Sequence, residues 1–390
     1  MTRVYVDRSW VHYAILSCYS IGGALYAIAV AYGQSWLRAA TILVLASGFY
    51  FLISTGAIGL LMGRRLRVPR KLSFEVGYDS LLAGLALSYF EFLTRLFRQA
   101  LPAVVSLLEV GLILGGTLLT SVQLLREWNR LPAKVLESAD KSLRVMKEAG
   151  VEVPENIWLV IDPSIHYSAL YYQSGDEQVI RIAPWAVNSQ LHGGIDATMI
   201  HEMSHIYRRL SKHPSHTPEI WRPVWAKFVE KLSQKYQYKV LERAFLDIGE
   251  IFANDVALRV LQRSGLNSIE SMEEEFQDQV LAKSAGSFRS SKKRWKTIGI
   301  IAHNSSAMAQ ITRHNLPDTE EKAKTRNDKL LQSLPHEAKF LHGYFYNLMV
   351  GLNEDITPEA YQEVLTQYLE KLVLAAENGF AEVERPPRNP

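Results

Sequence analysis

The chain has 390 residues, a formal net charge of +3 and a single cysteine, Cys18. So small a basic excess gives no reason to expect a nucleic-acid-binding protein. One cysteine excludes a disulfide framework and a thiolate metal site. Mean hydropathy is close to zero, at -0.04, but apolar residues are concentrated in the first 130 positions.

Four apolar runs in this first part predict a bundle of about four transmembrane helices, residues 1–130. They cover residues 11–32, 39–62, 78–93 and 101–125. A helix of about 20 apolar residues spans the hydrocarbon core of a bilayer. The third run is the weakest because it carries Asp79 and Glu91. Helices buried in a large domain are the alternative interpretation.

Basic residues between the runs predict the orientation of this bundle. With four spans, the most basic connection, after the second run, and the segment after the last run fall on the same side. Their basic residues are Arg64, Arg65, Arg67, Arg70 and Lys71, then Arg126, Arg130 and Lys134. The pattern predicts a multi-pass protein of the inner or cell membrane, with the remainder of the chain in the cytosol.

A small sheet is predicted next, after a helix over residues 134–149. Residues 157–161, 167–172 and 178–182 read as strands, and Ser174-Gly175-Asp176 reads as a hairpin turn. An exposed sheet edge can bind an extended peptide as a further strand. We expect a substrate-binding edge here; a purely structural hairpin is the alternative. Its candidate residues are Ser168, Ala169, Leu170 and Tyr171.

The motif H-E-x-x-H follows, at residues 201–205 in a segment with helical periodicity. His201 and His205, four residues apart, lie on one face of a helix and can bind one zinc ion. Glu202 can then accept a proton from a zinc-bound water. Asp196 is a candidate N-cap. A different face of this helix carries an apolar stripe that is expected to lie in the core, formed by Met199, Met203, Ile206 and Leu210. Ordinary helix residues without metal are the alternative.

A third ligand is needed, and the metzincin pattern does not supply it. Arg208 and Ser211 stand where that pattern requires glycine and histidine. Residues 246–258 form a second, largely apolar segment of helical composition that contains acidic groups. Burying a carboxylate without a partner is costly, so a carboxylate of this segment facing the metal accounts for this composition. A half-exposed amphipathic helix is the alternative.

These two segments together resemble the membrane-anchored gluzincins of the HtpX and CAAX prenyl protease type. The downstream motif of that family reads roughly E-x-x-A-D-x-x-A. The resemblance implies an α+β zincin domain over residues 131–380, with Glu250 as third ligand. It also implies a group that orients a ligand histidine, for which Asn254 and the following Asp255 are candidates.

Other polar segments have less specific interpretations. In the predicted surface loop 211–218, His213 and His216 are more often solvated than metal-bound. Residues 283–296, basic with Phe288 and Trp295, are predicted to form a loop that rests on anionic lipid headgroups or is simply solvated. In the family, a histidine and an arginine near residues 313–329 hold substrate or the oxyanion; His314 and Arg326 are the candidates.

The sequence therefore predicts a membrane-bound endopeptidase with one Zn²⁺ per chain. Glu202 and His314 are its predicted catalytic residues, and its expected substrates are membrane-associated or misfolded polypeptides, cut at the cytosolic face. The alternatives are a non-catalytic membrane sensor or scaffold and a prenyl-protein processing protease. Residues 381–390 are predicted to form a disordered tail.

Overall fold

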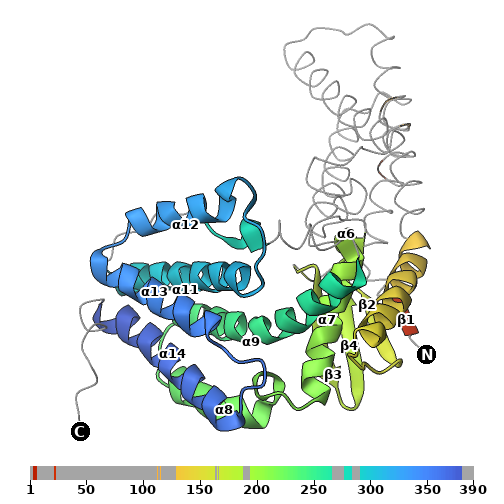
Figure 1. Ribbon diagram of the computed structural model, residues 1–390, viewed down its shortest axis with the longest axis horizontal. Helices are drawn as coiled ribbons and strands as arrows, with labels where there is room; N and C mark the ends of the chain where they lie inside the picture. Colours follow the sequence, from red (N-terminus) through yellow and green to blue (C-terminus); the bar gives the residue numbers. More distant parts are fainter. Residues whose placement is uncertain are drawn as a thin grey trace, which may run out of the picture. The chain divides into compact units, whose positions relative to one another are not determined.

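A computed structural model describes residues 3–6, 22, 112, 115, 129–162, 165, 167–187, 194–265, 276–282 and 290–379 (Figure 1). The chain divides into two compact units. The first combines Met1–Lys141 with Pro154–Ile195, and the second combines Ser142–Val153 with Asp196–Pro390. This division groups the small sheet with the N-terminal part of the chain.

The first unit contains a four-stranded sheet in the order β1-β2-β4-β3. Its strands are β1 (Arg3–Val6), β2 (Ile157–Ile161), β3 (Ala169–Ser174) and β4 (Glu177–Ile182). β1 and β4 both run parallel to β2, and β3 is antiparallel to β4. The three strands predicted from the sequence are confirmed, whereas β1 was not predicted. Helices also begin in the described part of this unit. Among them are a helix over residues 129–148 and the short α6 (Pro184–Val187).

Local sequence explains the hairpin and its edge. Gly175 has a φ of +61° in the turn between β3 and β4, a conformation that glycine adopts without strain. In β2, alternate residues beginning with Ile157 are buried, as expected for a strand with one face on the core. β3 pairs only with β4 and is an edge of the described sheet, with Leu170 exposed by 42%.

The second unit is helical in its described part. Its elements are α7 (Gly194–Leu210, from Asp196 onward), η2 (Pro214–His216), α8 (Pro218–Val229), α9 (Lys235–Ser264), α11 (Ser291–Arg313), η3 (Thr319–Glu321), α12 (Lys322–Gln332), α13 (His336–Val350) and α14 (Pro358–Asn378). The two predicted helices around residues 201–205 and 246–258 are confirmed as helices, and α9 extends well beyond the predicted segment at both ends.

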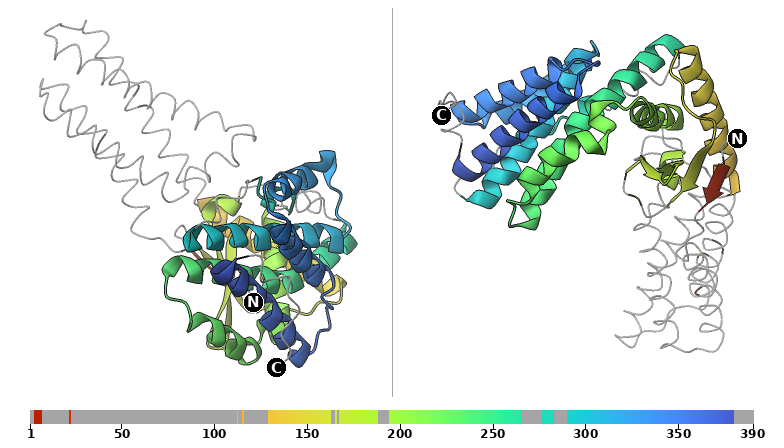
Figure 2. Two further views of the ribbon diagram at one scale, coloured as in Figure 1. Left: turned by 90° about the vertical axis from the view of Figure 1, so that its left-hand side faces the viewer. Right: turned by 90° about the horizontal axis from the view of Figure 1, so that it is seen from below.

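The core of this unit lies among α8, α9, α11, α13 and α14. α11 packs against α9, α13 and α14, and α14 also contacts α8 (Figure 2). Its largest fully buried side chains are Trp295, Tyr361, Tyr368, Phe252 and Phe345. Every residue of α9 from Ile251 to Leu258 is buried. Consecutive burial on all faces makes α9 a central helix of the unit rather than an amphipathic surface helix.

Two local predictions are wrong. Trp295, expected in a lipid-facing loop, is fully buried in α11 and donates a hydrogen bond to Glu377, because α11 begins at Ser291. Leu210, expected in the core stripe of α7, is half exposed at the end of the helix. Residues 336–378 are helical in two parts, since Gly351 ends α13 and Thr357 caps α14.

The predicted membrane bundle is not supported either. Of the helices in the described ranges, none is long and apolar enough to cross a membrane. This finding contradicts the predicted transmembrane fold class and the predicted multi-pass membrane location. The four apolar runs, apart from residues 22, 112 and 115, lie outside the described residues, as do residues 283–289 and the predicted tail.

Candidate metal centre

The first half of the site is a pair of histidines on α7. His201 and His205 lie one helical turn apart, with their Nε2 atoms separated by 3.1 Å. Other positions of this helix carry buried apolar side chains, among them Met199, Met203 and Ile206. Packing of these apolar side chains fixes the rotation of α7 about its axis, and this rotation directs both imidazoles to the same side.

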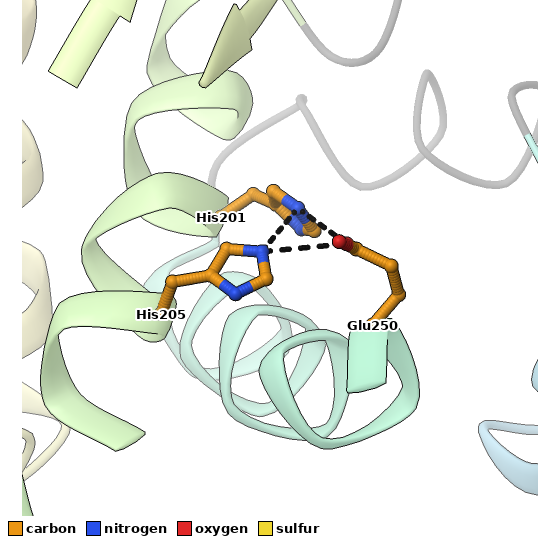
Figure 3. Close-up of side chains that lie close together, drawn as sticks. All are labelled: His201, His205 and Glu250. Atoms are coloured by element: carbon orange, nitrogen blue, oxygen red, sulfur yellow. Dashed lines mark hydrogen bonds and ion pairs between the residues drawn. The ribbon is translucent and has the colours of Figure 1, made fainter. Parts of the chain in front are cut away.

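The second half is Glu250, on α9. Its Oε2 lies 3.1 Å from His201 Nε2 and 3.3 Å from His205 Nε2. Figure 3 shows the two rings and the carboxylate converging on one point from two separate helices. Among the described residues, these three form the group of histidine, cysteine and acidic side chains placed to hold a metal ion.

The spacing of these atoms fits zinc. Tetrahedral zinc with bonds of about 2.0–2.2 Å holds neighbouring ligand atoms about 3.3–3.6 Å apart, since a tetrahedron's edge is about 1.63 bond lengths. The observed separations of 3.1, 3.1 and 3.3 Å are close to that edge. Two imidazoles and one carboxylate are also a ligand set of catalytic zinc sites, which leave a fourth position for water or substrate.

The electrostatics of the cluster favour a cation. Burial alone would raise the pKa of Glu250, but His205 and His201, when protonated, outweigh it through their charge and hydrogen bonds and hold the pKa well below its ordinary value. The carboxylate is therefore ionised. The Glu250 side chain is 40% exposed and that of His201 22%, so small molecules can reach the cluster from solvent.

An arginine joins the two helices that carry the ligands. Arg208 on α7 is buried and donates from Nε to the carbonyl of Phe252 on α9, at 2.9 Å. Its Nη2 donates to Glu354 Oε1 at 2.6 Å, and Arg259 donates to both oxygens of the same carboxylate at 2.7 Å. These contacts lower the pKa of Glu354 against the effect of its burial. They also restrict how far the histidines can move from Glu250.

The residues that sequence reasoning missed lie just after α7. His216 Nε2 is 2.7 Å from His205 Nδ1, the ring nitrogen that points away from the cluster in Figure 3. The predicted surface loop is wrong here, because His213, Pro214 and Ser215 are buried in and next to η2. Burial and the charge of His205 lower the pKa of His216 well below 6.5. A signal was present in the sequence: two prolines, at 214 and 218, confine this histidine-rich segment to a short turn.

The remaining predicted residues divide between α7, α9 and α11. Glu202 is buried on α7, beside His201 in sequence. Asn254 is buried on α9, but among the described contacts no hydrogen bond joins it to a ligand histidine. Asp255 accepts two hydrogen bonds from Arg313, each at 2.7 Å. His314, at the end of α11, has Nε2 3.2 Å from Asp255, without hydrogen-bond alignment.

Three of the predicted residues have contacts that differ from the sequence interpretation. Asp255 pairs with Arg313 instead of orienting a histidine, and His314 lies against Asp255 instead of the histidine pair. Arg326, expected near substrate, donates to the carbonyl of Gln277 and to Asp278. Ser168, Ala169, Leu170 and Tyr171 belong to the first unit, and the metal-ligand cluster belongs to the second.

Comparisons with known proteins give no further guide. The chain matches no protein-family model, no curated protein and no solved structure. The gluzincin resemblance accordingly rests on the two motifs alone.

Proposed function

We propose that this protein is a zinc-dependent peptidase that hydrolyses polypeptides. The observation that carries the proposal is the convergence of His201, His205 and Glu250, whose ligand atoms lie 3.1–3.3 Å apart. The two helices that carry them are joined by a hydrogen bond from Arg208. The same residues carry the resemblance to the HtpX and CAAX prenyl protease type of gluzincin, which we retain as a proposal for the family.

Each residue has a distinct task in this proposal. His201, His205 and Glu250 hold the zinc ion, which supplies a Lewis acid and lowers the pKa of water to about 7 when bound. Glu202, next to His201 in the H-E-x-x-H motif, accepts a proton from the attacking water and delivers it to the leaving amine. Arg208 and Glu354 keep α7 and α9 in register so that the ligands stay together.

A second candidate is a metal-binding scaffold without turnover. The contacts of Asp255 and His314 favour it, because two residues expected to serve catalysis pair with each other and with Arg313 instead. In this alternative the zinc site is structural, and Glu202 has no chemical task.

The variant Glu202→Gln separates the two candidates. It removes the proton acceptor but preserves shape and all three ligands. A peptidase should bind zinc as the wild type does and lose cleavage of an unfolded test protein such as casein. His303→Gln, on α11, is the control. Wild-type protein that is zinc-loaded yet cleaves neither casein nor itself supports the scaffold, and undiminished cleavage by Glu202→Gln refutes the role of Glu202.

A further inference from the structure

The segment after α7 contains a chain of hydrogen bonds that ends at a metal-ligand histidine. It runs from the carbonyl of Glu354 through His213, Ser215 and His216 to His205. The successive separations are 2.9 Å, 2.8 Å, 2.7 Å and 2.7 Å. Two of these links join residues of the same turn, one reaches back 11 residues to His205 on α7, and one spans 141 residues to Glu354.

At the Glu354 end of this series of hydrogen bonds, the positions of the hydrogens are fixed. A carbonyl oxygen can only accept, so His213 Nε2 carries a hydrogen and donates it to Glu354. The backbone N–H of Ser215 points at His213 Nδ1 from 3.3 Å, so this nitrogen accepts and carries no hydrogen. Burial lowers the pKa of His213 from 6.5 to about 4, in keeping with a neutral ring.

The donor and acceptor of each further hydrogen bond follow from counting the hydrogens on Ser215 and His216. The hydroxyl of Ser215 has one hydrogen, and it must donate this to the bare Nδ1 of His213. The oxygen of Ser215 is then an acceptor toward His216, so His216 Nδ1 carries a hydrogen. In neutral His216 the remaining nitrogen, Nε2, is an acceptor facing His205 Nδ1 at 2.7 Å.

The last step concerns the nitrogen that faces Glu250. When His205 donates from Nδ1 to His216, its Nε2 has a lone pair and no hydrogen. His205 Nε2 lies 3.3 Å from the carboxylate oxygen of Glu250 and 3.1 Å from His201 Nε2. The lone pair and the carboxylate oxygen of Glu250 repel each other at that distance unless a hydrogen or a metal ion lies between them. A metal ion removes this repulsion without altering any link of the chain.

We infer that His216, supported by Ser215 and His213, is a positioning residue that fixes the Nδ1–H tautomer of His205 and so presents Nε2 to zinc. Zinc-binding histidines commonly donate their other ring N–H to a carboxylate, carbonyl or water, which sets their orientation. Here a second histidine accepts that bond. The tautomers follow from counting the hydrogen bonds of neutral rings, whereas the effect on zinc affinity rests on the proposed function.

The tautomers can be read directly by NMR. Two-bond ¹H–¹⁵N spectra of the full chain with ¹⁵N-labelled histidine, recorded after chelation and after zinc loading, report which ring nitrogen carries hydrogen. We expect Nε2–H for His213 and Nδ1–H for His216 in both states, with each ring assigned by its own glutamine variant. An Nε2–H tautomer for His216, or Nδ1–H for His213, overturns the inference.

Zinc affinity measured by chelator competition tests the positioning role. His216→Ala should weaken zinc binding about 10- to 100-fold, the usual effect of losing a residue that orients a ligand. His216→Gln retains an acceptor and should recover part of this loss, and Ser215→Ala should weaken binding through His216. His342→Gln, a change at a buried histidine of α13 bonded to Asn327, is the matched control and should bind zinc as the wild type does.

The two proposals fail in different ways. Wild-type protein that binds no zinc refutes the metal centre, while the NMR tautomers still decide the hydrogen-bond chain. Unchanged zinc affinity in both His216→Ala and Ser215→Ala refutes the positioning role and leaves the metal centre intact. Should His216→Ala fail to fold, Ser215→Ala and the wild-type tautomers carry the test.

Discussion

Arg208 links the helices that carry the ligands, so its removal should lower both stability and zinc affinity. The side chain donates to the Phe252 carbonyl at 2.9 Å and to Glu354 at 2.6 Å, from a buried position. Hydrogen bonds involving a charged group are each worth about 1.5–3 kcal/mol. Glu354 keeps its two bonds from Arg259, so the loss is smaller than the sum. We expect Arg208→Met to lower the free energy of unfolding by about 2–4 kcal/mol.

Methionine is chosen because it retains most of the apolar contact of the arginine stem. Arg208→Lys keeps the charge but cannot reproduce the two-pronged donor geometry, so its effect should be intermediate. Arg222→Met removes an exposed arginine from α8 and should change stability by less than about 0.5 kcal/mol.

The measurement is urea unfolding followed by circular dichroism, paired with zinc affinity from chelator competition. Because Arg208 lies one turn beyond His205 and bonds two residues beyond Glu250, zinc affinity should fall together with stability. If Arg208→Met has the same free energy of unfolding as Arg222→Met, this account of how the helices are joined is refuted. Lower stability with unchanged zinc affinity would restrict the role of Arg208 to folding.

Two further predictions concern buried polar groups away from the ligands. Burial lowers the pKa of His342 from 6.5 to about 4, so the unfolded chain binds the proton first as the pH falls. Stability should therefore drop from about pH 6.5 to about pH 4, by about 3 kcal/mol for this group. His342→Gln should remove that part of the drop in urea unfolding, and an unchanged pH dependence contradicts the assignment. Asp255→Asn breaks a buried ion pair with Arg313 and should cost about 3–5 kcal/mol. Its zinc affinity should match that of the wild type, and a large loss of affinity would restore the sequence-based role of Asp255 in orienting a histidine.

Local geometry explains which parts of the site could be predicted. The positions of His201 and His205 follow from helical spacing, which is a property of four consecutive peptide bonds. A carboxylate ligand within residues 246–258 was predictable because a carboxylate in an apolar helical segment needs a partner, and the resemblance to the gluzincins singled out Glu250. The strands of the β3–β4 hairpin were predictable because Gly175 marks the turn.

Long-range contacts were not predictable from the sequence. β1 lies beside β2, whose residues are far away in the chain, and a four-residue strand has no distinctive periodicity. His213 and His216 read as solvated residues because their burial depends on Glu354, 141 residues beyond His213. Trp295 read as a loop residue for a similar reason, since its hydrogen-bond partner Glu377 lies at the end of α14.

The coordination of zinc itself tests the central claim most directly. X-ray absorption at the zinc edge, on protein loaded with one zinc ion per chain, should show two imidazole nitrogens and carboxylate or water oxygen at about 2.0–2.2 Å. The double variant His201→Ala/His205→Ala should retain no stoichiometric zinc. A zinc shell without imidazole in the wild type, or stoichiometric zinc in the double variant, would contradict a metal centre built from α7 and α9.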